Sequence, residues 1–287
     1  MPPNSLPAGL DEADISRVIE AALAEDVGTG DVTSQSVIPE DTRFTGVMAA
    51  RQPMVLAGLF LAERVFMRVE PRSIFTALAK DGDKLQAGGV IARIEGPARG
   101  LLTAERTALN LLQLLSGIAT QTRIYVERIA GTGCALLDTR KTIPGLRQLS
   151  KYATRVAGAK NHRMGLYDGV LIKDNHVAVC GSVAEAVRRA KADKRPNIEA
   201  ECDTLEQVQD ALAAGADILL LDNMDVDTLR QAVDLVGKRI PLEASGGVSL
   251  ETIRAIAETG VDFVSVGRIT QSAPAVDIGL DWQTHDQ

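Results

Sequence analysis

The sequence predicts an α/β protein with a small amino-terminal α+β domain and a carboxyl-terminal parallel α/β barrel. The first observation behind this prediction is a change of pattern along the chain. Short extended runs separated by turn residues fill the first 115 residues, whereas short apolar runs alternate with helical segments from Cys134 onward. The second is a regular spacing of 21 to 23 residues between the ends of the last four apolar runs, which is the length of one strand plus one crossover helix.

The amino-terminal domain is predicted to combine one helix with a mostly antiparallel sheet. Apolar residues follow helical spacing from Asp14 to Ala24, and an acidic loop with two glycines comes next. Short apolar or alternating runs then predict strands over 44–50, 54–57, 74–79 and 90–95.

A long helix is predicted to connect the two domains. It is expected to begin after Thr103, a good N-cap residue, and to run towards Ala130. The predicted boundaries are therefore residues 1–115 for the first domain and 116–271 for the barrel.

Six apolar runs define the predicted barrel strands, and each one leads to a polar residue or glycine. The runs are 135–137, 170–172, 198–201, 218–221, 240–242 and 263–266. Nearly continuous apolar strands that alternate with amphipathic segments, such as 204–213 and 250–259, are typical of a parallel sheet buried on both faces. A closed barrel is favoured over an open sheet because the carboxyl ends of its strands all meet at one mouth.

Composition limits the classes of function. A net charge of −7 argues against a general nucleic-acid-binding or membrane-surface role. Three widely spaced cysteines, and no stretch that resembles a signal peptide or membrane span, predict a cytoplasmic protein.

Basic residues are concentrated in one part of this acidic chain. Residues 138–176 contain eight Lys or Arg against three acids. Arg140 and Lys141 follow a strand end, and Lys173 directly follows another apolar strand, where a lysine is costly unless it meets an anion. His162 and Arg163 lie in the same segment, whereas His176 is expected to have a structural role. The pattern predicts a site for a ligand with several negative charges.

Acids and glycines follow the later strands. Glu199 and Glu201 point to the same face of one strand, and Asp222 ends the next, so Glu201 and Asp222 suit two sugar hydroxyls or a Mg²⁺ ion on a phosphorylated sugar. The glycines after the last two strands allow backbone N–H groups to approach a phosphate. The expected phosphate-binding residues are Ser245, Gly246, Gly247, Val266, Gly267 and Arg268. Together these groups favour transfer of a phosphorylated sugar by electrostatic stabilisation, without a covalent nucleophile.

At these residues the sequence resembles the quinolinate phosphoribosyltransferase family. The matching segments are EDVGTGDVTS (25–34), GLLTAERTALNLLQLLSGIAT (100–120), LDTRKTIPGLR (137–147), KNHRMGLYDGVLIKDNH (160–176), LLLDNM (219–224), EASGGV (243–248) and VDFVSVGRITQSAPAVDIGLD (261–281). The resemblance implies an amino-terminal α/β open-faced sandwich, joined by the tail 272–287, and an incomplete, TIM-like barrel. It also implies conversion of quinolinate and 5-phosphoribosyl-1-diphosphate to nicotinate mononucleotide, diphosphate and CO₂, with Mg²⁺, in NAD biosynthesis.

The resemblance further implies a role for each matching residue. Arg106, Thr139, Arg140, His162 and Arg163 would hold quinolinate, the first of these reaching the site from the partner subunit of a homodimer. Lys141 and Lys173 would meet the diphosphate, and Glu201 and Asp222 would act at the ribose and the metal.

Two alternatives remain at this point. A paralogue of the same fold would act on another base, and a dicarboxylate clamp of arginines argues for quinolinate against it. A non-catalytic barrel that senses a phosphorylated metabolite would have no need of Glu201 and Asp222.

Overall fold

The computed structural model describes residues 6–283 of the chain, which divides into two compact units. The first consists of Met1–Thr122, Ile143–Ala157 and Ser272–Gln287, and the second of Arg123–Thr142 and Gly158–Gln271. Helix α4 contains the boundary between residues 122 and 123. The first unit includes the segment 143–157, which the sequence placed in the barrel domain.

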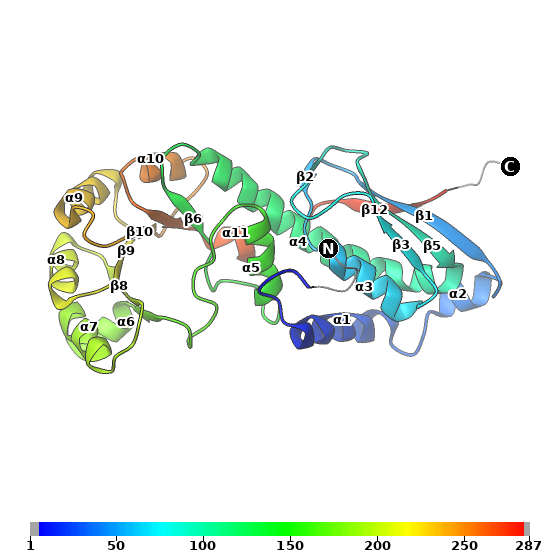
Figure 1. The fold of residues 1–287 in the computed structure, drawn as a ribbon, viewed down its shortest axis with the longest axis horizontal. Helices are drawn as coiled ribbons and strands as arrows, with labels where there is room; N and C mark the ends of the chain where they lie inside the picture. The colour runs from blue at the N-terminus through cyan, green and yellow to red at the C-terminus, as the bar shows by residue number, and fades with distance from the viewer. Residues whose placement is uncertain (1–5, 284–287) are drawn as a thin grey trace. The chain divides into compact units, whose positions relative to one another are not determined.

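The first unit is built on a four-stranded antiparallel sheet in the order β12-β1-β5-β3 (Figure 1). These strands are β1 (Arg43–Ala50), β3 (Ile74–Ala77), β5 (Val90–Pro97) and β12 (Ile278–Trp282). A separate two-stranded pair joins β2 (Met54–Val55) to β4 (Lys84–Leu85). The predicted strands 44–50, 54–57, 74–79 and 90–95 each overlap one of these strands, and the sequence also predicted the first helix.

Five helices accompany these strands in the first unit: α1 (Glu12–Val27), α2 (Val32–Val37), α3 (Leu59–Val69), the greater part of α4 (Ala98–Arg128) and α5 (Arg147–Val156). Helix α5 belongs here because Leu149 and Ala153 are fully buried in this unit's hydrophobic core. The hydroxyl of Tyr152 also donates a hydrogen bond to Asp81 of the same unit.

The predicted start of the long helix is wrong. Helix α4 begins at Ala98, directly after Pro97, so Thr103 is inside the helix and is not its N-cap. The Thr103 hydroxyl lies 2.8 Å from the carbonyl oxygen of Arg99 and 3.0 Å from Oδ2 of Asp31. Local hydrogen bonds of this kind let a threonine sit within a helix, and the sequence signal of a cap was therefore misleading.

The second unit contains a six-stranded parallel sheet in the order β6-β11-β10-β9-β8-β7. The strands are β6 (Ala135–Leu137), β7 (Val170–Ile172), β8 (Ile198–Cys202), β9 (Ile218–Asp222), β10 (Leu242–Ser245) and β11 (Phe263–Ser265). Strands β6 and β7 are at opposite ends of this order, and an isolated bridge joins Leu137 to Lys160. The arrangement confirms the incomplete TIM-like barrel.

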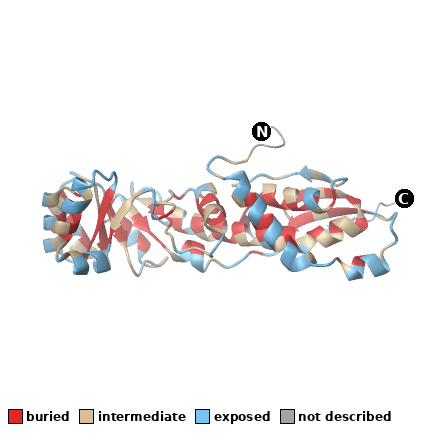
Figure 2. Ribbon diagram, turned by 90° about the horizontal axis from the view of Figure 1, so that it is seen from below, coloured by how far each residue is buried: buried red, intermediate tan, exposed pale blue. Residues whose placement is uncertain are grey.

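Six helices belong to the second unit: α6 (Asp174–Cys180), α7 (Val183–Ala192), α8 (Leu205–Ala214), α9 (Val226–Val236), α10 (Ile253–Ala257) and α11 (Arg268–Gln271). Figure 1 shows α7, α8 and α9 on the outside of the curved sheet. Their outer faces are exposed while the strands are mostly buried (Figure 2). The apolar strands thus form the core, and their carboxyl ends are left to carry polar side chains.

Candidate functional site

The carboxyl ends of the parallel strands surround a cavity of about 320 Å³, called here the mouth cavity. Its walls come from almost every strand of the second unit. The lining residues are Thr139, Arg140, Lys141, His162, Arg163, Leu171, Lys173, Leu220, Glu243, Ser245 and Ser265. The five basic residues between 140 and 173 that the sequence singled out as ligands, Arg140, Lys141, His162, Arg163 and Lys173, therefore meet at one place.

A second cavity, of about 250 Å³, follows strands β10 and β11 and is called here the glycine cavity. It shares Thr139, Lys141, Ser245 and Ser265 with the mouth cavity, so the two adjoin. Every residue predicted to bind a phosphate lines it, namely Ser245, Gly246, Gly247, Val266, Gly267 and Arg268. Backbone N–H groups in glycine-rich turns after the last strands of a barrel are a common phosphate site.

Gly246 and Gly267 are glycines because neighbouring atoms leave no room for a side chain. Gly246 has a φ of +88°, and a Cβ there would lie 2.1 Å from Oδ1 of Asn223 and 2.9 Å from its backbone nitrogen. A Cβ on Gly267 would lie 2.8 Å from Cδ of Lys141. The glycines thus keep the loop backbones close to one another and to the lysine.

Glu201 and Asp222 lie beside the mouth cavity, at the ends of neighbouring strands β8 and β9. Glu201 forms an ion pair with Lys173, whose side chain is 45% exposed, and its Oε1 accepts a hydrogen bond from the backbone N–H of Asp174. Burial, followed by the negative charge of Glu201, raises the pKa of Asp222 above its ordinary value. The lysine that follows β7 therefore meets an anion within the protein, and the two acids form a centre of excess negative charge.

Arg163 brings a second guanidinium group to the mouth cavity beside Arg140. Its Nη1 donates a hydrogen bond of 2.9 Å to the carbonyl oxygen of Gly169. Burial, followed by the positive charge of Arg140, lowers the pKa of Arg163, whereas Glu199 opposes this effect. Two like charges brought together in this way are suited to a ligand with two carboxylates.

Asp138 fixes the segment that carries His162 and Arg163. It is fully buried at the end of β6, and its Oδ1 accepts a 2.9 Å hydrogen bond from the backbone N–H of His162. Its Oδ2 accepts a 2.6 Å hydrogen bond from the side chain of Asn161. No functional role was predicted for Asp138, although an acid directly after an apolar strand was a usable signal.

Asp138→Ala is expected to destabilise the protein by about 3 kcal/mol, because hydrogen bonds to a buried charge are lost and their donors stay buried. Urea unfolding monitored by circular dichroism measures the change. Asp203→Ala, at an exposed residue after β8, is the control and should change the free energy of unfolding by less than about 0.5 kcal/mol. An Asp138→Ala variant as stable as the wild type would contradict this role.

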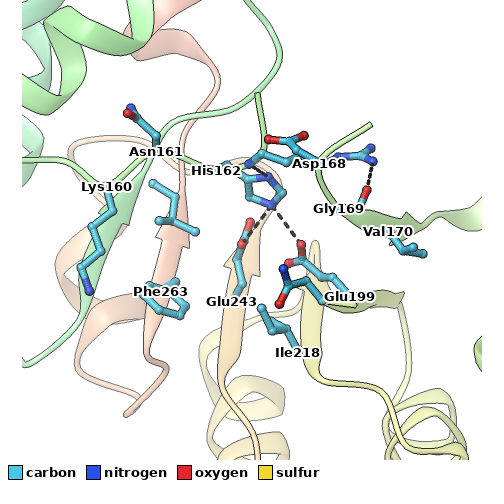
Figure 3. Close-up of a pocket in the computed structure, with 13 residues that line it drawn as sticks. Lys160, Asn161, His162, Asp168, Gly169, Val170, Glu199, Ile218, Glu243 and Phe263 are labelled. Carbon is cyan, nitrogen blue, oxygen red and sulfur yellow. Dashed lines mark hydrogen bonds and ion pairs between the residues drawn. The ribbon is translucent and has the colours of Figure 1, made fainter. Parts of the chain in front are cut away.

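Glu199 and Glu243 both face His162 (Figure 3), and Glu243 lines the mouth cavity whereas Glu199 does not. Their side chains are 8% and 2% exposed. Burial, followed by the charge of Glu199, raises the pKa of Glu243 well above its ordinary value. From the sequence, Glu199 was identified only as a neighbour of Glu201, and Glu243 was not identified as a site residue. An acid between two apolar residues of a predicted barrel strand could have pointed to Glu243.

A carboxyl group whose pKa is raised by folding stabilises the folded state only while it keeps its proton. Its contribution is complete below the pKa of the unfolded chain and is lost as the pH rises through the folded value. Since glutamine cannot ionise, the melting temperature of Glu243→Gln relative to wild type should rise between about pH 5 and about pH 8. A difference in melting temperature that stays constant over this range would contradict the raised pKa.

His176 and Arg106, which were also assigned roles from the sequence, do not line the mouth cavity. His176 accepts a 2.9 Å hydrogen bond from the backbone N–H of Lys173, which is the structural role expected for it. Arg106 is an exposed residue of α4 in the first unit. Physical reasoning from the sequence could not have identified it, because it lies far along the chain from the barrel strands.

Comparisons with known proteins agree with this site. The model of the quinolinate phosphoribosyl transferase N-terminal domain matches residues 31–116, and that of the C-terminal domain matches residues 118–281. The chain is 47% identical to the nicotinate-nucleotide pyrophosphorylase [carboxylating] of Mycobacterium leprae, covering 94% of this chain and 98% of the relative. It is 44% identical to the probable enzyme of the same name from Bacillus subtilis, covering 93% of each.

A solved structure gives the same result. The nicotinate-nucleotide pyrophosphorylase of Francisella tularensis superposes with a TM-score of 0.92 at 40% identity, covering 98% of this chain and all of the other. None of the helices within residues 6–283 combines the length and apolar character that crossing a bilayer requires. The resemblance seen in the sequence is confirmed, and the chain belongs to the quinolinate phosphoribosyltransferase family.

Proposed function

We propose that this protein transfers the phosphoribosyl group of 5-phosphoribosyl-1-diphosphate to quinolinate and releases nicotinate mononucleotide, diphosphate and CO₂. The observation that carries the proposal is that the mouth cavity and the glycine cavity adjoin and share four wall residues. One holds two guanidinium groups suited to a dicarboxylate, and the other holds the glycine turns suited to a phosphate. Two substrates that must react with each other would thus lie end to end.

The base would bind in the mouth cavity. Arg140 and Arg163 would pair with its two carboxylates, with Thr139 and His162 beside them. Arg106 of a partner subunit would complete this clamp in a homodimer. To reach another subunit, Arg106 must be exposed on its own chain, and it is exposed on α4. The cytoplasmic location stays a prediction from the sequence, and some plant relatives are named as chloroplastic or mitochondrial.

The phosphoribosyl donor would extend from the glycine cavity towards the base. Its 5′-phosphate would accept hydrogen bonds from the turns after β10 and β11, and Lys141 and Lys173 would meet the diphosphate. The carboxylates of Glu201 and Asp222 fit Mg²⁺, which takes oxygen ligands. The pKa of Asp222 is raised by burial and then by the negative charge of Glu201, which a cation would offset. When bound with the donor, Mg²⁺ would neutralise charge on the departing diphosphate.

The chemistry then needs no covalent link to the protein. The bond between C1′ and the diphosphate oxygen breaks, and the ribose ring takes up positive charge that Glu201 and Asp222 stabilise. The pyridine nitrogen supplies the electron pair for the new bond to C1′. The cationic ring then accepts the electron pair of the C2–carboxylate bond as CO₂ leaves, and a proton takes the place of the carboxylate at C2.

Substrate discrimination tests the proposal. We expect kcat/KM for quinolinate to exceed that for nicotinate by at least about 100-fold, because nicotinate lacks one of the two carboxylates that the arginines would bind. Steady-state assays with both bases at saturating donor measure this ratio. Equal turnover of nicotinate would support a paralogue that acts on another base.

The acids separate an enzyme from a sensor. Glu201→Ala and Asp222→Ala are each expected to reduce kcat by at least about 100-fold, because they remove charge that stabilises the transition state. Quinolinate affinity, measured by calorimetry, should change less than about threefold. Binding of the anionic ligands by a wild-type protein that shows no turnover would support the sensor instead.

A further inference from the structure

Both ring nitrogens of His162 have partners within the protein. The backbone N–H of Arg163 donates a 2.8 Å hydrogen bond to Nδ1. Because a backbone N–H can only donate, Nδ1 carries no proton, and the hydrogen of the neutral ring must be on Nε2. This assignment depends on which atom is the donor and not on the position of a hydrogen.

The Nε2 atom faces two buried carboxylates. It lies 3.0 Å from Oε2 of Glu199 and 3.5 Å from Oε2 of Glu243. The acids belong to β8 and β10, which flank β9, and they pair in register with Ile218 and Leu220 of that strand. Figure 3 shows the ring reaching both acids across the sheet. One oxygen of each acid, Oε1, is buried without a hydrogen-bond partner.

The same three side chains have the spacing of a metal centre, since one donor atom from each lies within 4.8 Å of the others. The hydrogen bond at Nδ1 argues against this role. A histidine that binds a metal through Nε2 normally carries a proton on Nδ1 and donates it to an acceptor. Here Nδ1 is itself the acceptor, so Nε2 is a donor towards the carboxylates.

The acids also lie next to a group of positive charges. Arg140 and Arg163 share the wall of the mouth cavity, and Glu199 favours the charged form of Arg163 while Arg140 opposes it. Glu199, Glu243, His162 and Arg163 also line another cavity, of about 280 Å³, near the amino ends of the strands. Glu243 lines both cavities, whereas Glu199 lines only this one and lies outside the mouth cavity that a ligand would occupy.

We propose that Glu199 and Glu243 are positioning residues of the base-binding site, which hold His162 as an Nε2–H donor, and that Glu199 supplies negative charge beside the Arg140–Arg163 pair. This inference rests on the proposed function. Glu199 is not part of the mouth-cavity wall and acts through its neighbours. The glutamates keep two like-charged guanidinium groups and the backbone between His162 and Arg163 in the geometry that a dicarboxylate needs, so the site is formed before the ligand arrives.

Kinetics of Glu199→Gln test the inference. The amide keeps the shape of the side chain and removes its charge, so we expect KM for quinolinate to rise about 10- to 100-fold. The KM for the phosphoribosyl donor should stay within about twofold, because the glycine cavity does not include Glu199. Glu243→Gln should raise KM for quinolinate less than Glu199→Gln does, because burial already favours the neutral form of Glu243 and the amide resembles it. Glu206→Gln, at an exposed acid of α8, is the matched control and should change neither constant.

A second measurement needs no substrate. The chain has three histidines, so selective ¹⁵N labelling and comparison with His162→Asn assign the side-chain signals of His162. In the wild type we expect a single Nε2–H form with an unprotonated Nδ1. In Glu199→Gln the signals should broaden or shift, because one acceptor of the Nε2–H is weakened, and in Glu206→Gln they should not change.

The outcomes separate the two proposals. Wild-type protein that does not turn over quinolinate would refute the proposed function, while the histidine spectrum would still test the positioning role. An Nδ1–H form, or Zn²⁺ binding that Glu199→Gln removes, would overturn the inference. So would a Glu199→Gln variant that keeps the wild-type KM for quinolinate, or that raises both KM values equally as its melting temperature falls.

Discussion

Gly246→Ala is expected to lower kcat/KM for the phosphoribosyl donor by at least about 100-fold, since displacing a binding group by about 1 Å can cost that much. The left-handed φ of Gly246 is strained for alanine, and the added methyl would overlap both the side chain and the backbone of Asn223. The loop must move, and its N–H groups would leave the positions from which they face a phosphate. The loss should appear mainly in KM for the donor.

The matched control is Gly237→Ala. Gly237 ends α9 with a φ of +57°, and the nearest atom to a Cβ there is 3.8 Å away. It carries the backbone strain of a left-handed alanine without a clash and lies outside both cavities. Its melting temperature should fall while KM for the donor stays close to the wild-type value. Wild-type kinetics in Gly246→Ala would contradict the assignment of the glycine cavity to the phosphate.

Arg163→Ala is expected to cost about 2 to 5 kcal/mol of transition-state stabilisation, as does the removal of one partner from a buried charge pair. That loss corresponds to a fall of roughly 30- to 5,000-fold in kcat/KM for quinolinate. The partly buried guanidinium is held by Gly169 and faces the mouth cavity with Arg140, so no other side chain takes its place. Arg163→Lys should recover only part of the loss, because an ammonium group lacks the planar fork that matches a carboxylate.

Arg188→Ala is the control for loss of a positive charge in the same unit. Arg188 lies on α7 with an exposed side chain that pairs with Glu185 three residues earlier. Such exposed pairs contribute little to stability. Neither Arg188 nor Glu185 lines the mouth cavity. The kinetics of Arg188→Ala should match the wild type. A similar fall in both arginine variants would show that net charge, and not the clamp, determines binding.

The strand ends are the part of the site that sequence alone predicts well. Apolar runs of the barrel identify buried strands, and the residue after each run is then placed at the mouth, as Lys173, Asp222 and Ser245 illustrate. Of these three, Lys173 and Ser245 line the mouth cavity, Asp222 lies beside it, and Ser245 comes three residues after the end of the predicted strand 240–242. The prediction works because a parallel sheet buried on both faces requires nearly continuous apolar sequence. Boundaries were less accurate, since the strand predicted at 240–242 is Leu242–Ser245.

The supporting residues were harder to predict because their roles depend on contacts across the sheet. Glu243 is a single acid in an apolar strand, and only the structure shows that it meets His162 and lies across β9 from Glu199. Asp138 looked like one more polar strand end, yet it binds the backbone of a segment more than 20 residues later. Helix α5 lies between two barrel strands in sequence but belongs to the first unit. A local sequence pattern does not show in which of two hydrophobic cores a helix is buried.

The most direct test is an assay of the purified protein with quinolinate labelled with ¹³C in its 2-carboxylate, the phosphoribosyl donor and Mg²⁺. The proposed function predicts that nicotinate mononucleotide, diphosphate and labelled CO₂ appear in equal amounts, and that all three depend on both substrates. Absence of the nucleotide, or formation of a nucleotide that keeps the labelled carboxylate, would contradict it.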